Sequence, residues 1–298
     1  VSFEGSTVEL DDFPLSDAEI MSIDRVVLIG MGTSMHAAMV GQHWIETLAR
    51  IPAETDNSSE FRYRDPIIDE HTLVVSVCQS GETADTLAAM CEAATHGARQ
   101  VTLCNYEGTQ ATRIAEGAIF MRAGLEIGVA ASKTFMCSLT SLYLLAIYLG
   151  IKRGTLEKAR LGELVRELAH LPQMLGDLVS QQQQYRRLAR KFSGHSDFLF
   201  LGRGVHFPLA MEGALKLKEI SYIHAEGYPA GEMKHGPIAL VDEQTPSVFV
   251  VPRGSIYPKI MSNLEEVKAR KGPVIAIACE GDEKIADMAD DVIYVPDV

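Results

Sequence analysis

The chain lacks an excess of positive charge. Its 298 residues include 27 lysines and arginines against 40 aspartates and glutamates, which gives a formal net charge of −13. No basic stripe outweighs this negative balance, so we expect no nucleic acid partner. An anionic ligand would have to be held locally, by dipoles and hydroxyl groups, against an unfavourable overall field.

Cysteine is scarce, and its spacing is not that of a metal site. The five cysteines form neither a C-x-x-C pair nor a Cys/His ligand pattern; they are Cys78, Cys91, Cys104, Cys137 and Cys279. We therefore predict no bound metal, and reduced thiols in a cytoplasmic protein. No signal peptide is visible, and we find no apolar run long enough to span a membrane.

A dinucleotide fingerprint is incomplete. Gly30 and Gly32 follow an apolar run, but Met35 stands where G-x-G-x-x-G requires its third glycine. No acidic residue closes a second strand in the expected way. The sequence therefore argues against a nicotinamide cofactor, and we expect no cofactor.

What the chain does contain is a repeat. Apolar runs alternate with helical patterns, which favours an α/β fold with a parallel sheet. The pattern of residues 26–32 returns at 198–204, that of 74–77 at 248–251, and that of 118–121 at 292–295. We predict two related lobes, each a doubly wound parallel sheet, joined by helices.

The repeat suggests domain boundaries. We expect a leading segment over 1–24, a first lobe over 25–152, connecting helices over 153–195 and a second lobe over 196–298. In the first lobe, a helix over about 127–149 should follow the strand at 118–121.

Within the connecting segment, Pro172 should break or kink a single long helix. The second lobe stops just after its last predicted strand, so we expect its closing helix and tail to be missing. The first residue is Val1, which favours a portion of a longer protein.

One turn carries the clearest ligand signal. The apolar run 72–77 leads into Cys78-Gln79-Ser80-Gly81-Glu82-Thr83, and a helical pattern follows. Free N–H groups and the positive end of a helix dipole favour an anion at such a turn. A second turn, Gly32-Thr33-Ser34, ends a neighbouring strand. Because ligands bind outside the carboxyl ends of parallel strands, both turns should face one crevice.

The second lobe carries charged groups at helical spacing. Glu212, Lys216 and Glu219 fall at i, i+4 and i+7, on one helix face. By spacing alone this is more often a solvated ion pair than a catalytic group. The Gly- and Pro-containing stretch 220–237 is expected to be a long ordered loop, and His235 within it is the better catalytic candidate. His224, among apolar neighbours, is expected to be structural.

These motifs together resemble a known family. Residues 32–34, 79–86, 126–130 and 212–237 closely resemble the isomerase half of the glucosamine-6-phosphate synthases. These are glutamine:fructose-6-phosphate aminotransferases built on two sugar-isomerase domains. The resemblance extends over nearly all of residues 25–298. It implies an enzyme that converts fructose 6-phosphate and ammonia to glucosamine 6-phosphate.

The resemblance also implies residue roles. In the first lobe, Gln79, Ser80 and Thr83 would hold the sugar phosphate, while Thr33, Ser34 and the backbone of Val129 would lie beside the sugar. In the second lobe, Glu219 would move a proton between C1 and C2, Lys216 would orient Glu219, and His235 would open the sugar ring from the partner subunit. A homodimer is thereby implied, with ammonia supplied by a separate glutaminase domain.

Two positions depart from the family pattern. Cys78 and Ala131 stand where the family usually has serine. A thiol is a weaker donor than a hydroxyl, so one phosphate contact at Cys78 would be weakened. Ala131 removes a sugar contact for which Ser132 could compensate. The family's C-terminal Schiff-base lysine has no counterpart here, and no internal lysine takes that role.

Two other functions remain open at this point. One is a stand-alone amino-sugar phosphate isomerase or deaminase that uses free ammonia. The other is a sugar-phosphate-binding regulator with no turnover. The presence of Lys216, Glu219 and His235 argues against the regulator, because a sensor needs the phosphate turn but no base. The start at Val1 argues against a stand-alone enzyme.

Overall fold

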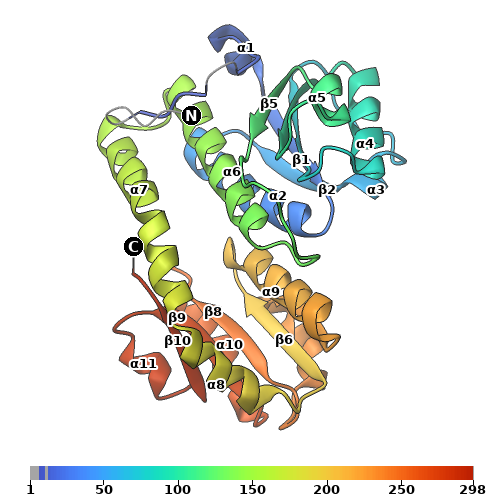
Figure 1. Cartoon of the computed structure of the whole chain (residues 1–298). Coiled ribbons are helices and arrows are strands. Elements are labelled where there is room, and N and C mark those ends of the chain that lie inside the picture. The colour runs from blue at the N-terminus through green and yellow to red at the C-terminus, as the bar shows by residue number, and fades with distance from the viewer. Residues whose placement is uncertain (1–6, 11–12, 298) are drawn as a thin grey trace. The chain divides into compact units, whose positions relative to one another are not determined.

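The chain forms two compact units, Val1–Arg166 and Glu167–Val298 (Figure 1). They are taken from a computed structural model that describes residues 7–10 and 13–297. Each unit contains its own parallel sheet and its own hydrophobic core.

The first unit is built on a five-stranded sheet of order β2-β1-β3-β4-β5, in which all neighbouring strands are parallel. All six residues of β3 are buried, as expected for a central strand covered on both faces. The strands are β1 (Arg25–Gly30), β2 (Ala53–Asn57), β3 (Thr72–Val77), β4 (Arg99–Cys104) and β5 (Gly117–Phe120).

Helices cover both faces of this sheet. One group of helices is α1 (Asp17–Ser22), α2 (Thr33–Trp44), the π-helix η1 (Ile45–Ala49) and α6 (Lys133–Lys152). The other group is α3 (Ser58–Phe61), α4 (Ala84–Thr95) and α5 (Gln110–Ile114). The strand residues Val27, Ile29 and Val74 pack with apolar residues of this second group, and the alternate residues Val26 and Leu28 are also fully buried.

The second unit repeats this arrangement, which confirms the predicted fold class. Its sheet has the order β10-β9-β8-β6-β7, again all parallel. The strand order therefore matches that of the first sheet, with β6 and β8 in the places of β1 and β3. The strands are β6 (Asp197–Gly202), β7 (His224–Pro229), β8 (Ser247–Val251), β9 (Val274–Cys279) and β10 (Asp291–Val295).

Two clusters of buried residues join the strands of this second sheet to the helices that pack on it. One contains Leu201, Phe249 and Leu264, and the other contains Phe192, Phe198 and Ala214. The helix α7 (Lys158–Ser180) begins in the first unit and ends in the second. The other helices of the second unit are α8 (Gln182–Phe192), α9 (His206–Ser221), η2 (Ala230–His235), η3 (Pro237–Leu240), α10 (Tyr257–Ala269) and α11 (Glu283–Ala286).

The helix predicted from residue 127 begins later. Residues 127–132 form no regular structure, and α6 begins at Lys133. The carboxylate of Glu126 accepts hydrogen bonds from the backbone N–H groups of Ser132 and Thr134. This capping of the first helical turn satisfies donors that have no partner inside the helix, and so fixes the start of α6.

The expectation that no apolar run is long enough to span a membrane was wrong, because the 20-residue helix α6 has the length and the apolar composition to do so. Of its most apolar 18 residues, 72% are buried inside the structure. Such burial is typical of the core helix of a soluble protein, where helices that are apolar on most sides pack against other elements.

Pro172 does not break its helix, and the stretch expected to be a loop contains a strand. The helix α7 continues through Pro172, and the interruption between α7 and α8 falls at Gln181. Pro172 is exposed, so water can reach the backbone carbonyl that it leaves unpaired. The stretch 220–237 is not all loop, because it contains β7. As an edge strand, β7 tolerates its internal Gly227 and its terminal Pro229.

Candidate functional site

The turn after β3 gathers small polar groups at the start of α4. The Cys78 thiol donates to Thr83 Oγ1 over 3.3 Å and lies 3.8 Å from Ser80 Oγ. Ser80 Oγ accepts the backbone N–H of Glu82 at 3.1 Å. Thr83 is the N-cap residue of α4, yet its side chain makes no capping bond. The positive end of the α4 dipole is therefore left to other acceptors.

A neighbouring loop fastens this turn. Gly81 has a φ of +68°, and a Cβ at this position would lie 2.3 Å from Thr109 Oγ1. The backbone N–H of Ala111 donates to the Gly81 carbonyl, and that of Gln110 donates to Glu82 Oε1. Only glycine fits both the left-handed backbone and the close approach of Thr109. The turn is thus held in one conformation.

The turn after β1 lies beside it. Gly32 has a φ of +52° and precedes Thr33 and Ser34, the first residues of α2. Since β1 and β3 are paired in parallel, both turns lie at the same edge of the sheet, as predicted. Between them and α6 is a cavity of about 200 Å³. Its lining residues are Met31, Thr33, Ser34, Gln79, Glu126, Gly128, Val129, Ala131, Thr134, Phe135 and Ser138.

A second cavity in this unit is larger but chemically plainer. It measures about 760 Å³ and lies along β5 and α6, with Phe13, Phe120 and Leu144 among its walls. Its charged groups, Glu107 and Arg122, form an exposed ion pair with each other at 4.0 Å. The smaller cavity is the better candidate site, because convergent polar groups rather than size give a pocket its specificity.

In the second unit, α9 carries a tight charge cluster. Lys216 Nζ lies 2.5 Å from Glu219 Oε2 and 3.3 Å from Glu212 Oε1. The Glu212 side chain is 6% exposed and that of Glu219 is 29% exposed. The predicted common helix face is therefore confirmed. One buried carboxylate and one accessible carboxylate share a single ammonium group, which can fix the position of the accessible one.

Both histidines of the next segment are exposed. His235 ends η2 and is exposed, which leaves its ring able to meet a group outside the unit. His224 is not buried among apolar groups. It is exposed on β7, and its Nδ1 lies 3.0 Å from Asp197 Oδ1. The hydroxyl of Ser196, followed by His224, lowers the pKa of Asp197.

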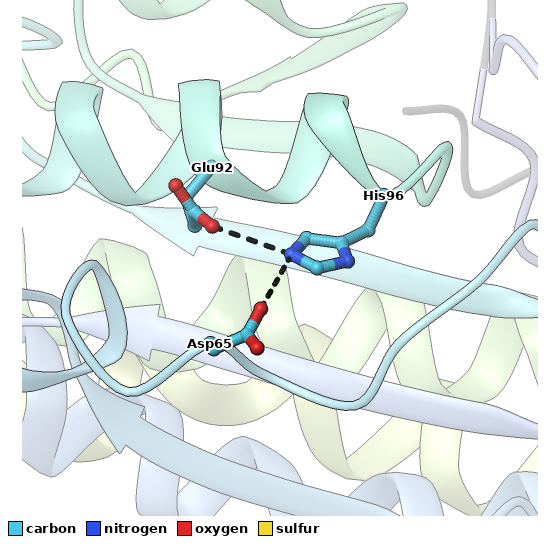
Figure 2. Close-up of side chains that lie close together, drawn as sticks. All are labelled: Asp65, Glu92 and His96. Atoms are coloured by element: carbon cyan, nitrogen blue, oxygen red, sulfur yellow. Dashed lines mark hydrogen bonds and ion pairs between the residues drawn. The ribbon is translucent and has the colours of Figure 1, made fainter.

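One group of side chains in the described part of the chain could hold a metal ion. Figure 2 shows the carboxylates of Asp65 and Glu92 converging on one ring nitrogen of His96, with His96 Nε2 3.6 Å and 3.3 Å from Asp65 and Glu92 respectively. The three ligand atoms lie within 4.8 Å of one another. An ion pair with a protonated imidazole accounts for the same contacts.

This cluster lies at the opposite end of α4 from the turn after β3. Glu92 and His96 lie at the C-terminal end of α4, whereas the turn after β3 lies at its N-terminal end, about 18 Å away for a 12-residue helix. The search for cysteine and histidine spacings missed the cluster, because Asp65 comes from a loop distant in sequence.

Comparisons with known proteins identify the family. The SIS domain matches residues 19–148 and 192–298, one match in each half of the chain. The chain belongs to the SIS domain family. The two matches lie on the two repeated sheets, so the duplication seen in the fold is a duplication of the SIS domain.

Two relatives of this SIS protein carry the same name. The glutamine–fructose-6-phosphate aminotransferase (isomerizing) of Thermus thermophilus is 49% identical over 295 residues, covering 99% of this chain and 48% of the relative. That of Bacteroides thetaiotaomicron is 43% identical over 297 residues, covering 100% and 48%. The chain therefore spans about half the length of these relatives.

A solved structure agrees. The C-terminal domain of glucosamine-fructose-6-phosphate aminotransferase from Francisella tularensis superposes with a TM-score of 0.94 at 34% identity, covering 99% of this chain and 83% of that one. This SIS chain is thus similar, in sequence and fold, to the C-terminal portion of such enzymes.

The structure brings together five of the eight predicted binding residues of this SIS protein around one cavity: Thr33, Ser34, Gln79, Val129 and Ala131. Ser80 and Thr83 belong to the adjoining turn. Cys78 is only 4% exposed and lies beneath that turn. Sequence reasoning missed Glu126 and Thr134 as lining residues. The polar run Ser132-Lys133-Thr134 before an apolar stretch was the available signal, because Ser and Thr favour helix starts.

Proposed function

We propose that this chain is the isomerase portion of an enzyme that makes glucosamine 6-phosphate from fructose 6-phosphate and ammonia. The observation that carries the proposal is the Lys216–Glu219 pair on α9, in a chain 49% identical over 99% of its length to an isomerizing aminotransferase. A carboxylate fixed by an ammonium group is what proton transfer between adjacent carbons requires.

The phosphate-binding role belongs to the first unit. Gln79, Ser80 and Thr83 present an amide and two hydroxyls at the N-terminus of α4, whose dipole favours an anion. Thr33, Ser34, Ala131 and the backbone of Val129 would lie along the sugar, because they line the adjoining cavity. Cys78 would act through Thr83, to which its thiol donates. Neutral donors suit a phosphate in a chain with a net charge of −13.

The chemical role belongs to α9. Ammonia adds to the C2 ketone of the open-chain sugar, and loss of water leaves an imine at C2. Glu219 removes a proton from C1. The electron pair forms a C1–C2 double bond, and the C2–N π pair moves to the nitrogen, which takes up a proton and becomes an amine. Glu219 then returns the carbon-bound proton to C2, while the C1 hydroxyl releases its proton to solvent and becomes the aldehyde, which balances the proton taken up by the nitrogen. Lys216 holds the carboxylate in place throughout.

Three further elements complete the proposal. The exposed His235 would assist opening of the sugar ring, in a homodimer where it acts on the partner subunit. A glutaminase domain elsewhere in the full-length protein would supply the ammonia. The protein would act in the cytoplasm.

Exchange of carbon-bound hydrogen tests this function. Glucosamine 6-phosphate incubated in heavy water with the full-length protein containing this chain should take up deuterium, and the Glu219→Gln variant should not. Exchange that persists in the variant would remove Glu219 from its role. A parent protein that releases ammonia from glucosamine 6-phosphate but never consumes glutamine would favour the stand-alone deaminase. Binding without any exchange would favour a regulator.

A further inference from the structure

The loop that joins β5 to α6 supplies one wall of the candidate sugar cavity. Gly128, Val129 and Ala131 line that cavity, yet residues 127–132 form no regular structure. The apex is also strongly exposed, with Ile127 90% and Val129 96% accessible. A loop with so little apolar burial needs other contacts to hold its backbone in one place.

Asn105 fixes the beginning of the loop. Its side-chain amide donates to the Gly124 carbonyl and accepts the backbone N–H of Ala123, both at 2.8 Å. Its own backbone N–H donates to the Gln79 carbonyl at 3.0 Å. Asn105 is nearly buried, at 9% exposure. One residue at the end of β4 thus ties the sugar loop to the phosphate turn.

Glu126 fixes the end of the loop. A single carboxylate oxygen, Oε2, accepts the Thr134 backbone N–H at 3.0 Å, the Thr134 hydroxyl at 2.8 Å and the Ser132 N–H at 3.3 Å. Lys133 Nζ donates to the Leu125 carbonyl beside it. The Thr134 N–H, followed by its hydroxyl, lowers the pKa of Glu126, so the carboxylate stays ionised at neutral pH.

We infer that Glu126 and Asn105 are positioning residues for the sugar but not for the phosphate. Together they anchor both ends of the loop and leave only residues 127–131 between the anchors. Preorganised backbone binds a ligand without the cost of ordering a loop at that moment. The phosphate turn has its own fastening through Thr109 and Ala111. Loss of Glu126 should therefore remove sugar recognition selectively.

This inference rests on the proposed function. Calorimetric titration of the full chain with two probes tests the inference separately from that function. The probes are glucosamine 6-phosphate and inorganic phosphate. Glu126→Ala should weaken glucosamine 6-phosphate binding by about tenfold or more, since bonds to a charged group are lost, and change phosphate binding by less than about twofold.

Matched variants sharpen the test. Glu126→Gln keeps an oxygen acceptor at the same place and should retain binding within about fivefold, as expected when only the charge is lost. Thr134→Val removes one of the three donors and should give a smaller loss than Glu126→Ala. Asn105→Ala should resemble Glu126→Ala. Glu163→Ala, on the exposed face of α7 and paired only with Arg160 among the contacts described, should match the parent.

The outcomes are distinguishable. Unchanged glucosamine 6-phosphate affinity in Glu126→Ala, or an equal loss for both probes, would overturn the positioning role. If the Glu126→Ala protein does not fold, Thr134→Val is tested instead. An unchanged ratio of the affinities for glucosamine 6-phosphate and phosphate in that variant would overturn the positioning role. If the parent protein binds glucosamine 6-phosphate no better than phosphate, the proposed function itself fails.

Discussion

The turns after β3 and β8 occupy the same place in the two repeated sheets but have opposite chemistry. After β3, the turn carries Gln79, Ser80 and Thr83, and the N-terminus of α4 has no capping side chain. After β8, the turn carries Arg253, whose guanidinium is paired with Asp297 and donates to the Glu280 carbonyl. The cation of the second turn thus already has a carboxylate partner in the chain itself.

The difference shows that the duplicated fold supplies two similar helix N-termini, and side chains decide which one is a site. An arginine held by an aspartate offers little to a phosphate, because its charge is already neutralised. Conversely, α9 of the second unit carries Glu212, Lys216 and Glu219, whereas the equivalent helix α2 has no lysine and no carboxylate. Under the proposed function, binding and chemistry are divided between the repeats.

The largest expected effect is on catalysis from α9. Glu219→Gln should lower the rate of hydrogen exchange at glucosamine 6-phosphate by about 10²- to 10⁴-fold, the usual contribution of a general acid–base group. Ligand affinity should change little, because the step occurs only in the transition state. Deuterium uptake followed by NMR, with the exposed Glu265→Gln on α10 as the control, measures this. An equal loss in the control would mean that the effect is not specific to α9.

The next effect concerns the two turns directly. Ser80→Ala should weaken binding of glucosamine 6-phosphate by roughly tenfold to a hundredfold, since a hydrogen bond to a charged group contributes about 1.5–3 kcal/mol. Ser255→Ala, in the turn after β8, should leave the affinity unchanged. Titration calorimetry of both variants decides the matter. Equal losses would place phosphate contacts at both turns and end the distinction between them.

Substitution by alanine should destabilise the protein more at the glycine of the turn after β3 than at the glycine of the turn after β8. Gly81→Ala forces an alanine into a left-handed conformation against Thr109, and should lower the free energy of unfolding by at least about 2 kcal/mol. At Gly254 the backbone is also unfavourable for alanine, but no atom lies within 4 Å of the added Cβ, so the loss should be smaller. Urea unfolding monitored by circular dichroism compares them. A larger loss at Gly254 would contradict the fastening role of Thr109.

The smallest effect is expected at Cys78. Because a hydroxyl is a better donor than a thiol, Cys78→Ser should bind glucosamine 6-phosphate at least as tightly as the parent, with a gain of no more than a few-fold. Bound ligand should also slow labelling of Cys78 by a small thiol reagent. Tighter binding by the parent, or labelling that the ligand does not affect, would show that the thiol faces away from the site.

Much of the site could be predicted because its signals are local. Small polar residues after a buried strand, as at 79–83, indicate a ligand turn from composition alone, and charges at i, i+4 and i+7 must share a helix face. The repeat of apolar runs fixed the place of three strands in each lobe. The polar edge strand β2 (Ala-Glu-Thr-Asp-Asn) and the Gly-containing β7 gave no such signal, since edge strands need less burial.

By itself, the amino-acid sequence determined the duplicated α/β organisation, the two polar turns and the charged face of α9, because each follows from periodicities of two to four residues or from a motif. Only the tertiary structure decided how those turns are used. Arg253 is neutralised by a carboxylate 44 residues away, Asn105 ties Gln79 to Gly124, and Glu126 fixes where α6 begins. The Arg253 and Asn105 contacts join residues distant in sequence, and the Glu126 contact spans an irregular loop, so no periodic pattern in the sequence indicates them.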